Sequence, residues 1–250
     1  DALLQTNQST ADTSYHLTGS IHVAGYPPAP LDLWASAGST LAAPMAAALL
    51  AGDRFSQLYS NSTRMGSIRS IDLDVTAVPR RVDEQLENAR LISGDSAHAG
   101  DTVVVEATVR PWQQPAHNIR IPIKLPARLD EGTVRLLVSD AGTLDRTLNP
   151  PRLFSRPPDM DAALSLARAL HRDDRIYVSL LLPDAQADVS GETLASLPLS
   201  MANALEPLRT TRDATLNGES AVVAGDAPAG GVLSGFQVLN LHIEAGGGLE

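Results

Sequence analysis

The stretch Thr102–Trp112, TVVVEATVRPW, decides the fold class of this 250-residue chain. Apolar and polar side chains alternate along it, with Val103, Val105, Ala107 and Val109 on one side and Glu106, Thr108 and Arg110 on the other. Successive side chains of a β-strand point to opposite faces, so a period of two indicates a strand with one buried face. We therefore expect the middle of the chain to build sheets.

Three further runs of the same kind surround this stretch. ENARLIS (87–93) precedes it, and HNIRIPIKLP (117–126) and GTVRLLVSD (132–140) follow it, with polar turns between them. Several short strands at this spacing, each with one apolar face, are typical of an antiparallel immunoglobulin-like β-sandwich. Pro122 lies on the polar side of its run and cannot donate a ladder hydrogen bond, which indicates an edge strand.

The residues before this region combine strand and helix patterns. Alternation predicts strands over 14–25, 31–35 and 67–78. The alanine-rich run 38–61 between them predicts a helix, for which Ser39 or Thr40 is a suitable N-cap. We expect its apolar stripe to pack into a core, and the stripe comprises Leu41, Met45, Leu49, Phe55, Leu58 and Tyr59.

The last third mixes the same two patterns. A helix is predicted to begin at Asp159 or Asp161 and to run to about Arg172, followed by a buried strand over 175–183. The remaining expected elements are a short helix and two strands, at 200–208, 220–225 and 235–244.

The predicted fold class is mixed α+β and predominantly β, with an antiparallel immunoglobulin-like β-sandwich module flanked by α/β segments. We expect an N-terminal strand–helix–strand segment over 1–82, the module over 83–146 and a C-terminal α/β segment over 147–246. The chain begins at Asp1 without a methionine, and 247–250 resemble a cloning remnant. We therefore expect a piece of a longer protein.

Composition and charge narrow the range of partners and cofactors. Hydrophobic residues make up 43% and charged residues 19% of the chain, as in ordinary globular domains. The net charge of −10 argues against nucleic acid or an anionic membrane as a partner. No apolar run approaches the roughly 20 residues of a membrane-spanning helix, so no membrane insertion is expected. The sequence has no cysteine, which excludes disulfides, thiolate metal sites and a cysteine nucleophile, and we expect no cofactor.

Two serines resemble nucleophiles of serine hydrolases. Gly94-Asp95-Ser96 matches a common nucleophile spelling, with His98 two residues on. Ala97, however, takes the place of the glycine that usually follows, and His98 is poorly placed to act as a base for Ser96. We interpret Ser96 as part of a turn and Ser39 as a helix cap, and expect no catalytic residue. A serine hydrolase that uses either residue stays an alternative.

Metal and ligand sites have only weak signals. The six histidines show no zinc-binding spacing, and His16 and His22 on one strand would stand about 20 Å apart. Asp72 and Asp74 share a polar face and could hold calcium, but a solvated edge is the simpler interpretation, and we expect no metal site. Trp34 and Trp112 are the candidate contact residues. A carbohydrate- or calcium-binding module therefore stays a second alternative.

Four phrases in fixed order carry a family resemblance: AGDTVVVEATVRPW, IRIPIKLPARLDEGTVRLLVSDAGTLDR, RIYVSLLLPDA and ETLASLPLS. Together they resemble the C-terminal region of large secreted bacterial proteins, best known from acidobacteria, of the sporulation factor IV B-type serine peptidase family. The resemblance runs from about Tyr15 to Ile243. The Gly-Met-Ser-Gly-Ser-Pro signature of that family is absent from this sequence, and Gly66-Ser67 does not replace it.

The resemblance implies a non-catalytic accessory or interaction region of an exported peptidase-like protein. Its location would be secreted or periplasmic, in the cell envelope. Its partner would be the N-terminal part of the same parent chain or another protein, and it carries over no catalytic residue.

Overall fold

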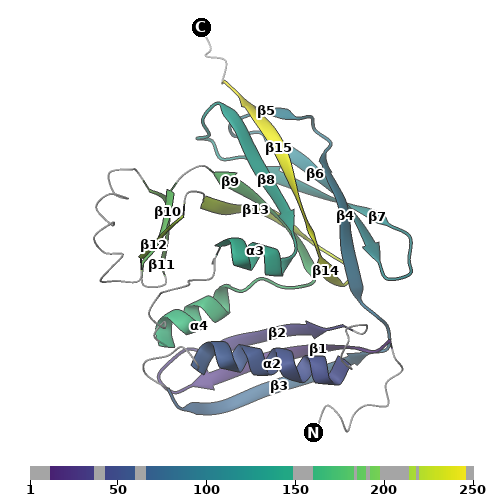
Figure 1. Cartoon of the computed structure of the whole chain (residues 1–250), viewed down its shortest axis with the longest axis vertical. Coiled ribbons are helices and arrows are strands. Elements are labelled where there is room, and N and C mark those ends of the chain that lie inside the picture. Colours follow the sequence, from purple (N-terminus) through teal and green to yellow (C-terminus); the bar gives the residue numbers. More distant parts are fainter. Residues whose placement is uncertain are drawn as a thin grey trace. The chain divides into compact units, whose positions relative to one another are not determined.

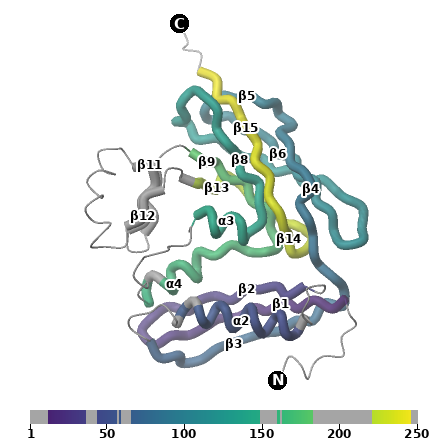
Figure 2. Tube along the Cα trace, in the orientation of Figure 1, coloured from purple at the N-terminus to yellow at the C-terminus, as the bar shows by residue number. Residues whose placement is uncertain are grey.

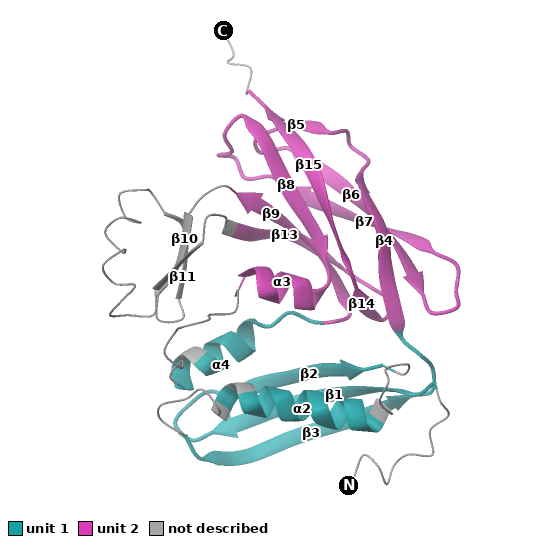
Figure 3. Cartoon of the chain, in the orientation of Figure 1, with its two compact units in different colours: residues 1–82, 152–172, 186–216 teal, residues 83–151, 173–185, 217–250 magenta. Residues whose placement is uncertain are grey.

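A computed structural model describes residues 12–36, 43–59, 66–148, 160–182, 185–189, 192–197, 214–217 and 220–245 (Figure 1). The fold is predominantly β, as predicted, with several sheets and a smaller helical part. The chain divides into two compact units that each draw on separate segments (Figure 3). Unit 1 comprises 1–82, 152–172 and 186–216, and unit 2 comprises 83–151, 173–185 and 217–250.

Unit 1 contains an antiparallel sheet with helices on one face. The strand order is β2-β1-β3, so β3 forms one edge (Figure 2). Its elements are β1 (Ser14–Val23), β2 (Ala29–Ala35), β3 (Ile68–Val78), α2 (Ala43–Tyr59) and α4 (Met160–Ala169). One core joins the apolar face of β1 and β2 to the two helices, and it includes Leu17, Ile21, Leu33, Ala47, Leu58, Met160 and Leu164.

The predicted stripe of the first helix is partly wrong. Met45 and Leu49 are exposed to 49% and 57%, whereas Ala47 and Leu58 are buried and Phe55 is partly buried. A run of alanines offers several faces of similar hydrophobicity, so α2 can turn its small Ala47 toward the sheet. Leu41 lies outside the described residues.

Unit 2 contains two sheets that share one core. Their strand orders are β13-β9-β8-β15-β5 and β14-β4-β6-β7. The elements are β4 (Asp83–Leu91), β5 (Ser96–His98), β6 (Thr102–Pro111), β7 (His117–Lys124), β8 (Gly132–Ser139), α3 (Ala141–Leu148), β9 (Arg175–Leu182), β13 (Ser220–Pro228), β14 (Val232–Ser234) and β15 (Phe236–Glu244). Core side chains come from both sheets, among them Val105, Val109, Ile121, Ile123, Leu136, Val178 and Leu241.

The two sheets of unit 2 approach each other closely at one side. A Cβ on Gly225 of β13 would lie 2.9 Å from the Ile123 side chain and 3.3 Å from the Pro122 carbonyl oxygen of β7. The missing side chain therefore lets β13 lie against β7, the last strand of the other sheet, so Pro122 is on an edge strand as predicted. Most strand pairs are antiparallel, but the three-residue strands β14 and β5 pair in parallel with β4 and β15.

The structure confirms the predicted strands of the middle region and those at 14–25, 31–35, 67–78, 175–183, 220–225 and 235–244, within a few residues at their ends. It adds α3, β5, β14 and a small sheet of order β11-β10-β12, formed by β10 (Ala185–Val189), β11 (Glu192–Leu197) and β12 (Ala214–Asn217). The helix predicted at 200–208 lies outside the described residues. The predicted division of the chain into segments that begin at 83, 147 and 247 stays a prediction from the sequence. No described helix is long and apolar enough to cross a membrane.

Candidate functional site

The edge strand β3 exposes both of its faces. On the side of the sheet that faces the helices, Ile71, Leu73 and Val75 are exposed to 45%, 43% and 39%. Ile21 and Leu17, which lie opposite Ile71 and Val75 on β1, are buried, because α2 contacts β1 and β2 and α4 contacts β2. The helices thus cover the centre of the apolar face and leave its β3 margin in solvent.

Gly19 sets how closely β3 approaches the sheet. It lies opposite Leu73, and a Cβ on it would stand 2.0 Å from the Asp72 carbonyl oxygen. That distance is far shorter than a van der Waals contact, so only glycine fits there without moving β3.

The polar face of β3 carries two carboxylates, Asp72 and Asp74. Asp72 lies opposite Ser20, and its side chain is 70% exposed. Asp72 Oδ2 and Ser20 Oγ each lie 3.0 Å from His22 Nε2. Asp74 lies opposite Thr18, and its side chain makes no hydrogen bond or ion pair with any residue that the structure describes. The face therefore offers negative charge beside an exposed apolar strip.

A second polar group on the same sheet surrounds the candidate contact residue Trp34. The indole stacks on His16 with ring centroids 4.0 Å apart and an interplanar angle of 7°. His16 Nε2 lies 2.7 Å from Asp32 Oδ1, and Arg172 Nε lies 3.7 Å from the other Asp32 oxygen. One ring face of Trp34 is thus occupied, which makes it a packing residue of the β1–β2 pair on that side.

Trp112 lies in unit 2 at the end of β6, where the chain turns toward β7. Its side chain is 45% exposed, and its backbone amide donates to the Asp83 carbonyl oxygen at 3.0 Å. Gln113 takes a left-handed conformation, with φ of 54°, in the turn that follows. Of the two tryptophans, Trp112 thus has the more accessible ring.

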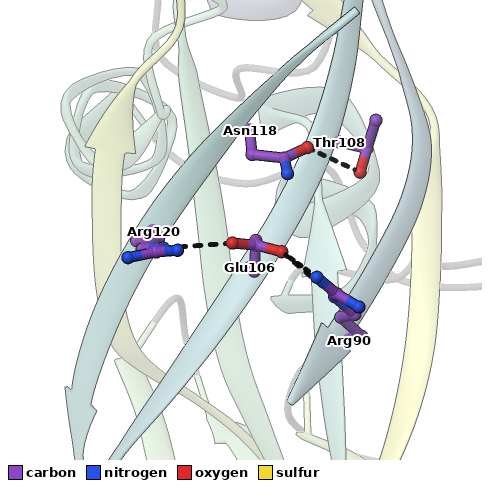
Figure 4. A network of polar contacts seen from close by, with 5 residues as sticks. All are labelled: Arg90, Glu106, Thr108, Asn118 and Arg120. Carbon is purple, nitrogen blue, oxygen red and sulfur yellow. Dashed lines mark hydrogen bonds and ion pairs between the residues drawn. The ribbon is translucent and has the colours of Figure 1, made fainter. Parts of the chain in front are cut away.

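The outer face of the four-stranded sheet holds a carboxylate with a very different environment. Glu106 on β6 is buried and lies between arginines from the two neighbouring strands (Figure 4). Arg90 donates from Nε and Nη2 to Oε1 at 3.0 and 2.6 Å, and Arg120 donates from Nε to Oε2 at 3.0 Å. Nearby, Thr108 donates to Asn118 Oδ1 at 3.0 Å. These bonds tie β4, β6 and β7 together across their solvent face.

Electrostatics on this face follow from those bonds. The hydrogen bonds from Arg90 and Arg120 lower the pKa of Glu106, because they favour its charged form. A hydrogen bond from Arg110 lowers the pKa of Glu87 in the same way and raises that of Arg110. Both oxygens of Glu106 are occupied, so the residue is suited to holding strands together and poorly suited to proton transfer.

Neither candidate serine forms a side-chain hydrogen bond with a histidine base in the described ranges. Ser20 Oγ does lie 3.0 Å from His22 Nε2, but Asp72 Oδ2 contacts that same nitrogen at 3.0 Å, whereas a catalytic triad places the carboxylate on the other ring nitrogen. Ser96 is the exposed first residue of β5 and pairs with His242 of β15, so the expected turn contains a short strand. His98 faces Asp101 and Glu244, at 3.5 and 3.7 Å. Ser39 lies outside the described residues. Within them, no three histidine, aspartate or glutamate side chains gather as metal ligands, and Asp72 contacts His22.

Comparison with other proteins adds no assignment: no family model, no curated protein and no solved structure matches the chain. Sequence reasoning interpreted Asp72 and Asp74 as part of a solvated edge, which β3 is, but missed that the apolar side chains of β3 are also exposed. The spacing of the β3 residues gave no signal of this exposure, since β1 has the same alternation and its apolar side chains are buried.

Proposed function

We propose that this chain is a non-catalytic interaction region of an exported bacterial peptidase-like protein and that unit 1 offers β3 to a protein partner. The exposure of β3 carries this proposal: its apolar side chains are half-exposed, and among the described strands it pairs only with β1. An edge strand presents unpaired backbone donors and acceptors, to which an extended segment can add as a further strand.

The exported, peptidase-like parent rests on the resemblance of phrases such as AGDTVVVEATVRPW to that family. We infer that unit 2 is an immunoglobulin-like module in a broad sense. Two mostly antiparallel sheets over one core support this inference. The connectivity differs from that of an immunoglobulin domain. Apart from the three-residue β5, the first three strands of unit 2 are β4, β6 and β7, and they pair in that order within one sheet, whereas the second and third strands of an immunoglobulin domain lie in different sheets.

Two measurements test the two halves of the proposal. Incubation with a fluorophosphonate probe should leave the protein unlabelled. Labelling that disappears in Ser96→Ala or Ser39→Ala would establish a serine hydrolase instead.

For the interaction half, a nine-residue peptide of alternating Val and Thr, N-methylated at its Thr residues, should shift the amide resonances of β3. The Asp72 carbonyl oxygen points toward β1, so Ile71, Leu73 and Val75 direct their backbone groups outward and would pair with the Val residues opposite them. The methyl groups block one edge and prevent self-association, while the other edge stays able to pair. The same peptide methylated at every amide should cause no shift. Absence of any shift with the first peptide would contradict strand addition to β3.

A further inference from the structure

We propose that the partner segment for β3 alternates apolar side chains with lysine or arginine and belongs to another protein. This inference rests on the proposed function and names the chemistry of the partner. In an added antiparallel strand, directly opposite residues point to the same face of the sheet. Alternation in β3 therefore requires alternation in its partner.

The apolar half of the pattern follows from the side of β3 next to the helices. Ile71, Leu73 and Val75 extend the buried apolar face of β1 by one strand, and each is only about half covered. Apolar side chains at every second position of an added strand would remove these three from water.

The basic half follows from the opposite face. On the β1 side, Asp72 and Asp74 lie beside the uncharged Ser20 and Thr18. Of the two carboxylates, His22 contacts Asp72 and not Asp74, and it also contacts the Ser20 hydroxyl. The chain as a whole has a net charge of −10. Cations placed directly across from these two carboxylates would form cross-strand pairs, which stabilise a sheet, whereas acidic side chains would repel them.

The same charges disfavour a second copy of this chain as the occupant. The longest antiparallel self-pairing of Ile68–Val78 places residue 73 opposite residue 73. In that register, Asp72 of each copy lies directly opposite Asp74 of the other, so two like-charged pairs form. Shifting the centre by one residue either way places Asp72 against Asp72 or Asp74 against Asp74. Each arrangement puts like charges directly opposite one another.

Charged residues on an edge strand also protect proteins against aggregation, and this simpler role makes a different prediction. A purely protective edge would bind no added strand of any charge. A docking edge would rank strands by charge and would lose that ranking when its own charge is cancelled.

Three fluorescent nine-residue peptides test the proposal. Each has Val at odd positions and Lys, Thr or Glu at even positions, and is N-methylated at the even positions only. We expect the Lys peptide to bind more tightly than the Thr peptide by up to about five-fold per charge pair, with the Glu peptide weakest. Added salt should reduce the preference for Lys, because salt screens exposed charges.

Asp74→Lys should remove the preference for the Lys peptide, because the new cation cancels the negative charge of the neighbouring Asp72. Asp130→Lys makes the same charge change in the exposed β7–β8 loop and should leave the preference for Lys intact. Equal binding of the three peptides, or an equal effect of both variants, would overturn the proposed partner chemistry while leaving strand addition standing. Binding of none of them would overturn strand addition as well. Concentration-dependent dimers whose formation Asp74→Lys alters would instead identify a second copy as the occupant.

Discussion

β3 of unit 1 and β6 of unit 2 have the same pattern and opposite surroundings. Apolar residues recur at every second position in both, over 71–77 in β3 and over 103–109 in β6. β6 lies between β4 and β7, its apolar side chains are buried, and its Glu106 has an arginine from each neighbour. β3 has a described neighbour on one side, its apolar side chains are half-exposed, and Asp74 has no described partner.

The difference shows that alternation specifies the faces of a strand but leaves its neighbours open. A carboxylate between two basic strands becomes a structural bond, whereas a carboxylate on an open edge stays available to a partner. Whether a strand is structural or accessible thus depends on what lies beside it.

A matched pair of core truncations should show the largest contrast. Ile121→Ala removes a side chain that is 1% exposed and should destabilise unit 2 by about 2–5 kcal/mol. Ile71→Ala, at 45% exposure, should cost unit 1 about 1 kcal/mol or less. Urea unfolding followed by Trp112 fluorescence for unit 2 and Trp34 fluorescence for unit 1, in single-tryptophan backgrounds, measures both. Equal losses would mean that β3 is covered.

Gly19→Ala tests how β3 is held against β1. The new Cβ would meet the Asp72 carbonyl oxygen, so we expect a loss of about 1–3 kcal/mol in unit 1. Gly52→Ala in α2 is the control, because no atom lies within 4 Å of its Cβ position and alanine favours helix. Unfolding monitored through Trp34 should show the first variant weakened and the second unchanged or stabilised. Unchanged stability of Gly19→Ala would contradict the close approach.

Acid should weaken unit 2 partly through Glu106. Its pKa is lowered in the folded state, so its contribution is present above the unfolded value of about 4.3 and is lost as pH falls through the folded pKa. Glu106→Gln should lower stability at pH 7 and flatten the decline below about pH 4. Urea unfolding midpoints measured from about pH 2.5 to about pH 7, a range that brackets the unfolded pKa of glutamate, test this prediction. Glu131→Gln, in an exposed loop, should leave the decline unchanged.

The smallest expected difference is in how strongly acrylamide quenches the fluorescence of the two tryptophans. Trp112 is 45% exposed, whereas Trp34 is partly buried and stacked on His16. Acrylamide should therefore quench a protein that retains only Trp112, through Trp34→Phe, more strongly than one that retains only Trp34, through Trp112→Phe. The reverse order would assign the more accessible ring to unit 1.

Much of the fold was predictable because a period of two identifies strands regardless of their partners. The exposure of Leu73 was not, since its spacing matches that of the buried Leu17, and only the positions of α2 and α4 distinguish them. The arginines around Glu106 required knowledge of the strand register. One missed element did have a local signal: Asp140 Oδ1 accepts from the Thr143 amide at 2.6 Å, the N-cap that begins α3.

Amide hydrogen exchange of the free protein tests the open edge of β3 most directly. Along residues 70–76, we expect alternate amides to exchange slowly, where they donate to β1, and rapidly, where they point outward. Along β6, neighbours on both sides should make consecutive amides slow. Uniformly slow exchange along β3, as slow as along β6, would contradict the account.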